Sequence, residues 1–104
     1  MEECIFCKIV NKELPGEIFY EDKKVAAFKD IHPLAPFHLL IVPKKHISSV
    51  DHLEEKDKLL MGELILAAQK IARKKKLKGY KLQINVGKLA GQIVDHLHLH
   101  LLSK

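Results

Sequence analysis

The sequence predicts an α+β fold, with a five-stranded, mostly antiparallel sheet, one long helix and a short N-terminal helix. The first observation is the strict alternation of polar and apolar residues over positions 96–101, which is typical of a half-buried strand. The second is a helical spacing of apolar residues over positions 54–77. The predicted order, three strands, the helix and then two more strands, favours an antiparallel sheet packed against one helix.

Each predicted strand is a short apolar or alternating run bounded by turn-forming or charged residues. The first two strands are joined at Asp22-Lys23 into a hairpin, and two prolines keep residues 30–36 as a loop before the third strand. Ahead of all the strands, residues 4–12 are expected to form the short helix. The predicted strands span residues 17–21, 24–29, 37–42, 80–86 and 94–102.

The long helix is predicted over residues 54–77, because five apolar side chains at helical spacing fall on one face. These side chains are Leu60, Leu64, Ala67, Ala68 and Ile71. Gly62 lies inside this helix, where glycine costs about 1 kcal/mol relative to alanine, and a close packing contact would explain it. Gly79 is expected to end the helix as its C-terminal cap.

The composition limits the class of protein. The 104 residues suffice for one hydrophobic core but not for two, so we expect a single domain over residues 1–104. The apolar runs are too short for a transmembrane helix, and the first four residues lack the basic start and apolar core of a signal peptide. We therefore expect a cytoplasmic protein with no membrane partner. With only two cysteines, a disulfide scaffold is not expected.

The net charge is +5, and six basic residues gather in one stretch: Lys70, Arg73, Lys74, Lys75, Lys76 and Lys78. Such a cluster is either a nucleic-acid patch or the basic last turn of a helix, where cations suit the negative end of the helix dipole. No aromatic residue is interleaved for base stacking, so the second interpretation is favoured and no nucleic-acid partner is expected.

Three histidines, His96, His98 and His100, should project from one side of the last predicted strand, because side chains alternate faces along a strand. Three aligned imidazoles indicate a reactive site or a metal site, since Thr, Lys or Glu are more usual on an exposed strand face. The loop before this strand carries Gly87 and Gly91, which allow backbone N–H groups to approach an anion closely.

Cys4 and Cys7 have the spacing at which two thiolates bind one tetrahedral zinc ion. A redox role would need a strand before the pair, and none is predicted there. A structural zinc needs two further ligands, and the spacing alone does not choose them from the seven histidines. Two buried, reduced thiols without a metal are the alternative.

These features together resemble the histidine triad (HIT) family of nucleotide-binding proteins and nucleotidyl hydrolases or transferases. The run of alternating histidines and leucines over residues 96–102 matches the family signature. Residues 4–10 resemble the family's N-terminal opening, and residues 28–47, which include His38, resemble its central block. The resemblance covers almost the whole chain. It is greatest for the branch of small purine-nucleotide phosphoramidases.

The resemblance implies a role for several residues. His98 corresponds to the nucleophile that takes the nucleoside monophosphate. Positions that match contacts to the base, ribose and phosphate are Asp30, Ile31, Asn85, Gly91, Gln92, His98 and His100. Positions that match the ligands of a structural zinc, with no organic cofactor, are Cys4, Cys7, His46 and His96. Relatives form a homodimer with one continuous sheet, so we expect a homodimer that binds a purine nucleotide or nucleotide conjugate.

The expected reaction begins with in-line attack of neutral His98 on phosphorus, while its other ring nitrogen donates to a backbone carbonyl that fixes the tautomer. The nucleotide then stays on His98 until water hydrolyses the intermediate. Backbone N–H groups of the Gly91-Gln92 turn and the His100 side chain are expected to stabilise charge on the phosphate oxygens.

Three departures from the family pattern keep other hypotheses open. Ile93 stands where close relatives carry a serine whose hydroxyl contacts the phosphate. Asp95 replaces an aromatic residue, and a carboxylate there would repel a phosphate unless it is turned away or paired. The chain also stops four residues after His100, where many relatives continue. The alternatives are a nucleotide-binding module with weak or no catalysis, and a metal-dependent hydrolase that uses the His-x-His strand.

Overall fold

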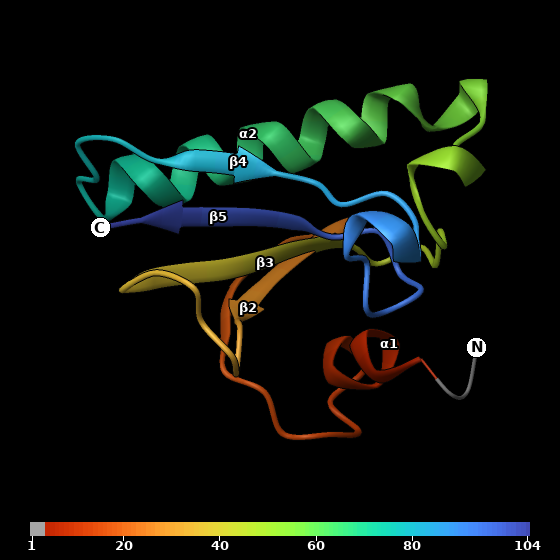
Figure 1. Ribbon diagram of the computed structural model, residues 1–104, viewed down its shortest axis with the longest axis horizontal. Coiled ribbons are helices and arrows are strands. Elements are labelled where there is room, and N and C mark those ends of the chain that lie inside the picture. The colour runs from red at the N-terminus through yellow and green to blue at the C-terminus, as the bar shows by residue number, and fades with distance from the viewer. Residues whose placement is uncertain (1–3) are drawn as a thin grey trace.

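Five strands form one antiparallel sheet, as predicted, in the computed structural model, which describes residues 4–104. The order across the sheet is β1-β2-β3-β5-β4, so the last strand in sequence lies between β3 and β4 (Figure 1). Every neighbouring pair of strands is antiparallel. The strands are β1 (Ile18–Glu21), β2 (Val25–Lys29), β3 (Phe37–Pro43), β4 (Lys81–Gln83) and β5 (Leu99–Ser103).

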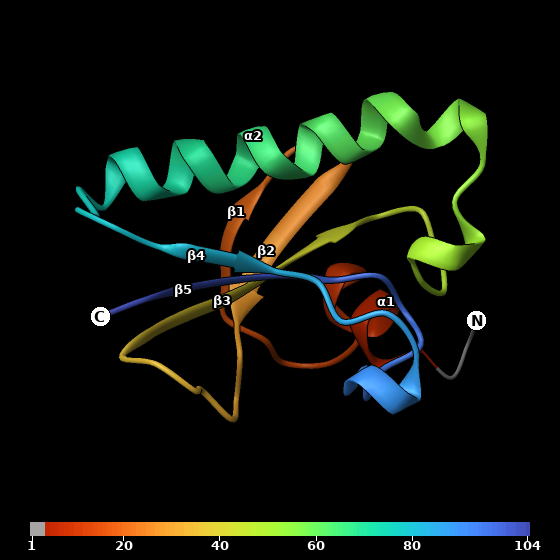
Figure 2. The same cartoon turned by 45° about the horizontal axis from the view of Figure 1, so that its top comes forward.

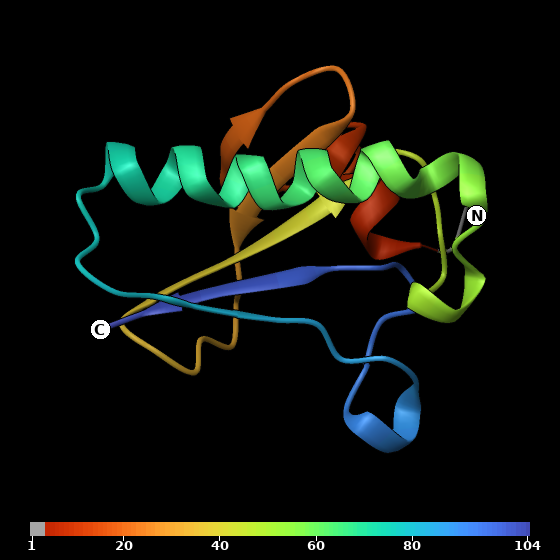
Figure 3. The same cartoon turned by 90° about the horizontal axis from the view of Figure 1, so that it is seen from above.

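Two helices pack on opposite faces of this sheet (Figure 2). The long helix α2 (Lys58–Lys74) crosses the strands on one face, as the view from above shows (Figure 3). The short helix α1 (Ile5–Val10) lies on the other face. Three single turns of 3₁₀-helix complete the structure: η1 (Val50–His52), η2 (Glu55–Asp57) and η3 (Lys88–Ala90).

The alternation of side chains along β2 and β3 supplies a core to each face. Toward α2, Leu39 and Ile41 pack with Leu64 and Ile71 in a cluster of buried apolar residues. Toward α1, Leu40 and its neighbours pack against Phe6 and Val10. Burying both faces explains why β3 is almost continuously apolar. It also brings α1 close to the sheet face on which the histidines gather.

The long helix is shorter than predicted at both ends. Its first predicted turn is η2, where Glu54 and Asp57 form a capping box. The helix ends in a Schellman motif, with hydrogen bonds from the Leu77 N–H to the Ala72 carbonyl (2.9 Å) and from the Lys76 N–H to the Arg73 carbonyl (3.1 Å). Lys76 takes the left-handed conformation that this motif requires, with φ 57°.

The prediction that Gly79 caps this helix was wrong. Gly79 does not cap the helix, because the chain has already turned at Lys76, three residues earlier. Gly62 makes no close contact among the described residues, since a Cβ placed on it would meet nothing within 4 Å. Packing within the described chain therefore does not explain Gly62.

The last two strands are also shorter than predicted, and this changes the histidine geometry. β5 begins only at Leu99, so His96 and His98 precede the ladder instead of lying in it. The chain bends there, because the His96 N–H donates to the Val94 carbonyl (2.8 Å). Residues 96–99 are all buried. The predicted alternation of side chains is nevertheless kept. Phe6 of α1 contacts the rings of His96 and His98, and the His98 ring lies 5.0 Å from that of His100. The intervening leucines, Leu97, Leu99 and Leu101, belong to the core on the α2 side. Among residues 4–104, no helix combines the length and apolar character needed to cross a membrane.

Candidate functional site

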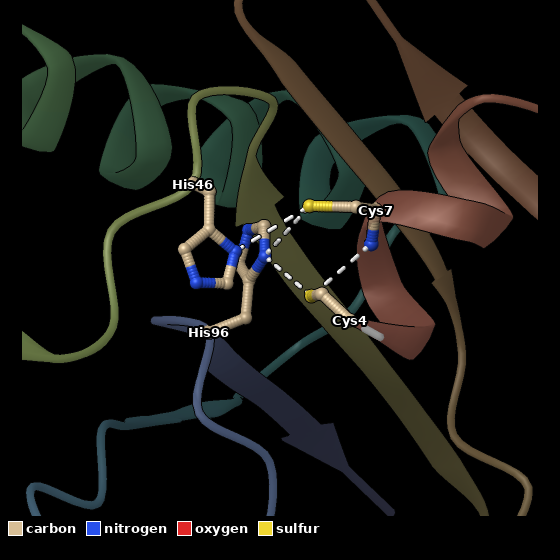
Figure 4. Close-up of side chains that lie close together, drawn as sticks. All are labelled: Cys4, Cys7, His46 and His96. Carbon is tan, nitrogen blue, oxygen red and sulfur yellow. Dashed lines mark hydrogen bonds between the residues drawn. The ribbon is translucent and has the colours of Figure 1, made fainter. Parts of the chain in front are cut away.

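The four predicted metal ligands, Cys4, Cys7, His46 and His96, lie together. Their sulfur and nitrogen atoms all fall within 4.8 Å of one another (Figure 4). Cys4 is the N-cap of α1 and Cys7 lies in its first turn, whereas His46 follows β3 and His96 precedes β5. The His96 Nδ1 atom is 3.2 Å from Cys4 Sγ and 3.6 Å from Cys7 Sγ. The His46 Nδ1 atom is 3.4 Å from Cys7 Sγ.

This donor set fits a structural zinc ion. Tetrahedral zinc with ordinary bond lengths separates sulfur and nitrogen ligands by roughly 3.5 Å, close to the distances found here. His96 Nε2–H donates to the Pro43 carbonyl at 2.8 Å, which leaves Nδ1 unprotonated toward the sulfurs. Burial lowers the pKa of His96 to about 4, so its ring is in the neutral form that binds metal. Burial, and then Cys4, raise the pKa of the Cys7 thiol to about 11, so a thiolate there needs a cation.

His98 has one ring nitrogen engaged and the other available. Its Nδ1–H donates to the backbone carbonyl of His96 at 2.7 Å. In the neutral ring, the unprotonated nitrogen is therefore Nε2, which keeps a free lone pair. The Phe6 ring holds the His98 ring edge to face, with 5.2 Å between ring centroids and an interplanar angle of 85°.

His100 belongs to a chain of hydrogen bonds that begins in the loop before β3. The Leu34 N–H donates to His38 Nδ1 at 3.0 Å, so the His38 proton lies on Nε2. His38 Nε2–H then donates to His100 Nδ1 at 2.9 Å. His100 consequently carries its own proton on Nε2, a buried atom with no partner among the described residues. This series of hydrogen bonds thus leaves the His100 Nε2–H group as a donor for a ligand.

His38 itself was not among the predicted site residues. Its position, a histidine in an otherwise apolar strand, was the available signal. Asp30 lies beside it, with its Oδ2 3.4 Å from His38 Nε2. Burial lowers the pKa of both His38 and His100, the latter to about 4, although Asp30 opposes the shift. The rings are therefore neutral near pH 7, as the hydrogen-bond chain requires.

Gln92 and Gly91 brace the loop instead of offering free donors. The Gln92 amide donates to the carbonyls of Ser48 (2.7 Å) and Val94 (3.0 Å), and its oxygen accepts from the Gly87 N–H (2.8 Å). The backbone N–H groups of Gly91 and Gln92 donate to carbonyls within the same loop. The expectation that these two N–H groups meet a phosphate therefore does not match their hydrogen bonding in this structure.

The remaining predicted contact residues differ in hydrogen bonding and exposure. Asn85 Nδ2 donates to the Gly91 carbonyl at 3.4 Å, and Gly91 has the left-handed φ of 94°. A Cβ on Gly91 would approach Asn85 Nδ2 to 3.3 Å, so the loop favours glycine there. Asp30 Oδ1 accepts from the His32 N–H, which forms a tight turn. Ile31 is 82% exposed at the surface of that turn.

The three triad rings do not converge on one point, which disfavours a shared metal. The His96 ring faces the cysteines, His98 bonds a backbone carbonyl, and His100 bonds His38. A second close group, made of Asp30, His38 and His100, also has metal-like spacing. Its two ring nitrogens are, however, already joined directly by a hydrogen bond.

A cavity of about 740 Å³ lies elsewhere, beside the C-terminal end of α2. Four lysines line part of it: Lys76, Lys78, Lys81 and Lys104. None of the predicted site residues lines this cavity, so its size does not bear on the histidine chemistry.

Comparison with known proteins gives consistent matches over the full described length. Residues 3–104 match the family model described as "Scavenger mRNA decapping enzyme C-term binding". "Protein HitA" of Neisseria gonorrhoeae is 46% identical over 103 residues, which cover 98% of this chain and 96% of that protein. A "HIT family hydrolase" structure from Legionella pneumophila is 45% identical with a TM-score of 0.94, covering 97% of this chain and 92% of the other. A "Histidine Triad Protein" from Clostridium difficile is 40% identical with a TM-score of 0.97, covering 100% and 92%.

Proposed function

Because the chain belongs to the histidine triad family, we propose that it is a nucleotide-binding hydrolase or transferase that forms a covalent intermediate on His98. Its substrates are nucleoside monophosphate conjugates, either phosphoramidates or dinucleoside polyphosphates. The observation that carries this proposal is the hydrogen bond from His98 Nδ1–H to the His96 carbonyl, which leaves Nε2 as a free nucleophile.

In the proposed reaction, His98 Nε2 forms a bond to phosphorus as the bond from phosphorus to the leaving group breaks. An amine leaving group takes up a proton from solvent water as it departs, and the later hydrolysis returns one proton to the solvent. The His100 Nε2–H donates to an oxygen on phosphorus, because that donor has no other partner among residues 4–104. Water then attacks phosphorus, which releases the nucleoside monophosphate and a proton and restores neutral His98.

The other predicted contacts take supporting roles in this proposal. Asp30 and Ile31 contact the ribose and base, and Asn85 lies near the phosphate. Gly91 and Gln92 shape the phosphate side by bracing their loop, which agrees with their internal hydrogen bonds. The ligand is a purine nucleotide or its conjugate.

The proposed cofactor is one zinc ion held by Cys4, Cys7, His46 and His96. Bound by four protein ligands, the ion has no open position for water, so its contribution is structural. No organic cofactor is needed, because the imidazole of His98 supplies the nucleophile.

The proposed assembly is a homodimer formed through α2 and the free edge of β4. Leu59 and Leu66 recur at helical spacing on the outer face of α2 and are 78% and 53% exposed. Gly62 lies between them with open space where a side chain would be, and a glycine lets a second backbone approach closely. Among residues 4–104, β4 pairs only with β5, so within this part of the chain its other edge is free to extend the sheet into a second copy.

The test is the replacement of His98 by glycine. Turnover of adenosine 5′-phosphoramidate should fall by several orders of magnitude while the nucleotide still binds, because a nucleophile has been removed. Mass spectrometry of rapidly quenched wild-type protein should find a nucleotidyl adduct on the peptide that contains His98. His52→Ala, at an exposed histidine, is the control. Turnover of His98→Gly within a few-fold of wild type would overturn the proposal.

A further inference from the structure

We infer that Cys4, Cys7, His46 and His96 are positioning residues for His98, and that a metal ion bound by them fixes the orientation and tautomer of the reacting ring. This inference rests on the proposed function, because it concerns the nucleophile of that reaction. In this role the four residues would affect the rate of the reaction as well as the stability of the fold.

The first link is that one residue serves both centres. The ring of His96 is fully buried, and its two nitrogens are engaged by the cysteine sulfurs and by the Pro43 carbonyl. The backbone carbonyl of the same residue accepts the hydrogen bond from His98 Nδ1–H at 2.7 Å. These side-chain contacts anchor His96 on two sides, so a displacement of the residue together with its backbone is what would move the acceptor that selects the His98 tautomer.

The second link fixes the plane of that acceptor. The His96 carbonyl and the Leu97 N–H belong to one planar peptide group. The Leu97 N–H donates to the Ile47 carbonyl at 2.7 Å, so this peptide group is held from both sides. Ile47 directly follows His46, which is itself a ligand in the cluster. A metal bound to His46 thereby steadies the segment that clamps the His96 carbonyl.

The third link runs through α1. Phe6 lies between the two cysteines in sequence and packs edge to face on His98, at 5.2 Å, and on His96, at 5.8 Å. Helix α1 has only six residues, too few for a helix of that length to be stable by itself. Coordination by Cys4 and Cys7 would anchor α1 to the sheet and hold Phe6 against the reacting ring.

Together, the three links predict that the metal affects the rate of the reaction at His98. As His98 Nε2 bonds to phosphorus, the ring becomes cationic and the Nδ1–H bond to the His96 carbonyl strengthens. A carbonyl held in place supplies that stabilisation without rearrangement. Loss of the metal should therefore lower kcat about tenfold to hundredfold, with a smaller effect on KM.

The first experiment reads the ring directly by ¹⁵N NMR of histidine-labelled protein. In the zinc-loaded protein, His98 should show one population, with a protonated Nδ1 and an unprotonated Nε2. After zinc removal with a chelator, or in Cys7→Ser, the His98 signals should shift toward a mixture of tautomers, and zinc should restore the chelated wild type. Lys8→Ala, a change on α1 at the residue that follows Cys7, should keep the wild-type signals. An unchanged His98 tautomer in folded, metal-free protein would overturn the inference.

The second experiment remains informative if the metal-free protein unfolds. Coupling between two sites is reciprocal, so removing the His98 ring must weaken zinc binding if zinc positions that ring. Competition against a chromophoric chelator should show about a twofold to tenfold lower zinc affinity for His98→Ala. His100→Ala is the matched control and should keep the wild-type affinity. Equal zinc affinities for the two variants would contradict the inference.

Activity measurements separate this inference from the proposed function. If the NMR signals and zinc affinities change as expected but no form of the protein turns over a nucleotide conjugate, the proposed reaction is wrong and the positioning role stands. If wild-type protein is active and the metal-free, folded protein is equally active with the same tautomer, the positioning role is wrong and the proposed reaction stands.

Discussion

Ile93, where the resemblance to the family leads us to expect a serine, is 89% exposed in the loop before the triad. Ile93→Ser should increase kcat for adenosine 5′-phosphoramidate about tenfold to hundredfold, because one hydrogen bond to a charged group is worth roughly 1.5–3 kcal/mol. The thermal stability should hardly change, since the isoleucine does not pack inward.

Leu89→Ser is the matched control for Ile93→Ser. Leu89 is a fully exposed apolar residue of the same loop, so the polarity change is comparable. It should leave kcat unchanged. If Ile93→Ser is folded and no faster, the isoleucine does not limit turnover, and dinucleoside polyphosphates become the favoured substrate class. Asp95, the other departure, is also exposed.

The buried triad predicts how folding stability depends on pH. Burial, and then the neighbouring His98 and His38, lower the pKa of His100 from its ordinary 6.5 to about 4, while Asp30 opposes the shift. Above about pH 6.5, His100 is neutral in both the folded and the unfolded protein, and its contribution is complete. Between pH 6.5 and 4, only the unfolded chain takes up the proton, so the free energy of unfolding should fall.

Urea denaturation from pH 4 to pH 8 measures this effect. His100→Gln should show a shallower loss of stability between pH 6.5 and 4 than the wild type, because one titrating group has been removed. Parallel curves for the two proteins would show that His100 is already solvated and able to accept a proton in the folded state.

At the residue scale, the sequence predicted which residues form the Cys/His cluster, but not the hydrogen bonds that individual side chains make. The motif spacing led to the four residues of the Cys/His cluster, which the structure brings together. It did not reveal His38, because an isolated histidine in an apolar strand has no spacing signal. Nor did it reveal that the Gln92 side chain joins its loop to the Ser48 carbonyl, because Ser48 lies 44 residues away in the sequence.

At the scale of single elements, the end of α2 offers a direct test of backbone strain. Lys76 adopts φ 57°, a conformation that costs a lysine more than a glycine. Lys76→Gly should raise the free energy of unfolding by about 0.5–1 kcal/mol, because relief of strain exceeds the added entropy of the unfolded chain.

Urea denaturation of Lys76→Gly and Lys74→Gly checks this prediction. Lys74 is the last residue of α2, where glycine should destabilise by up to about 1 kcal/mol. Destabilisation by both changes would indicate that the left-handed turn is not kept in solution.

The elements themselves were largely predictable, with errors of two kinds. Alternation and helical spacing gave all five strands and both helices, since each has one or two buried faces. Predictions from local sequence patterns failed at the ends of elements, where tertiary contacts determine the backbone conformation. The alternation of residues 96–100 reads as one strand, but His96 turns toward the cysteines and the ladder begins at Leu99. Gly79 is a good capping residue, yet the helix ends earlier at a lysine.

At the scale of the whole molecule, the proposed dimer predicts the effect of a charge on the outer face of α2. Leu66→Lys should weaken self-association by about a hundredfold or more, because a buried interface residue would become a charge without a partner. Sedimentation velocity over a range of concentrations measures the change. Leu89→Lys places the same charge at another exposed leucine and should leave association unchanged. A wild-type protein that sediments as a monomer at high concentration would refute the dimer.

The arrangement of the strands also determines the order in which the molecule can be completed during synthesis. The β1–β2–β3 meander pairs neighbours in sequence, so it can form as soon as residue 43 has been made. β4 has no partner until β5 exists, because β5 lies between it and β3. The pairing of Phe37 with Ser103 spans most of the chain, and such long-range contacts form slowly. His96 and His98 directly precede that strand and His100 lies in it, so a chain made only as far as residue 95 lacks both the strand that joins β4 to the sheet and the proposed nucleophile. Closing the described sheet and supplying the nucleophile therefore depend on the same late segment.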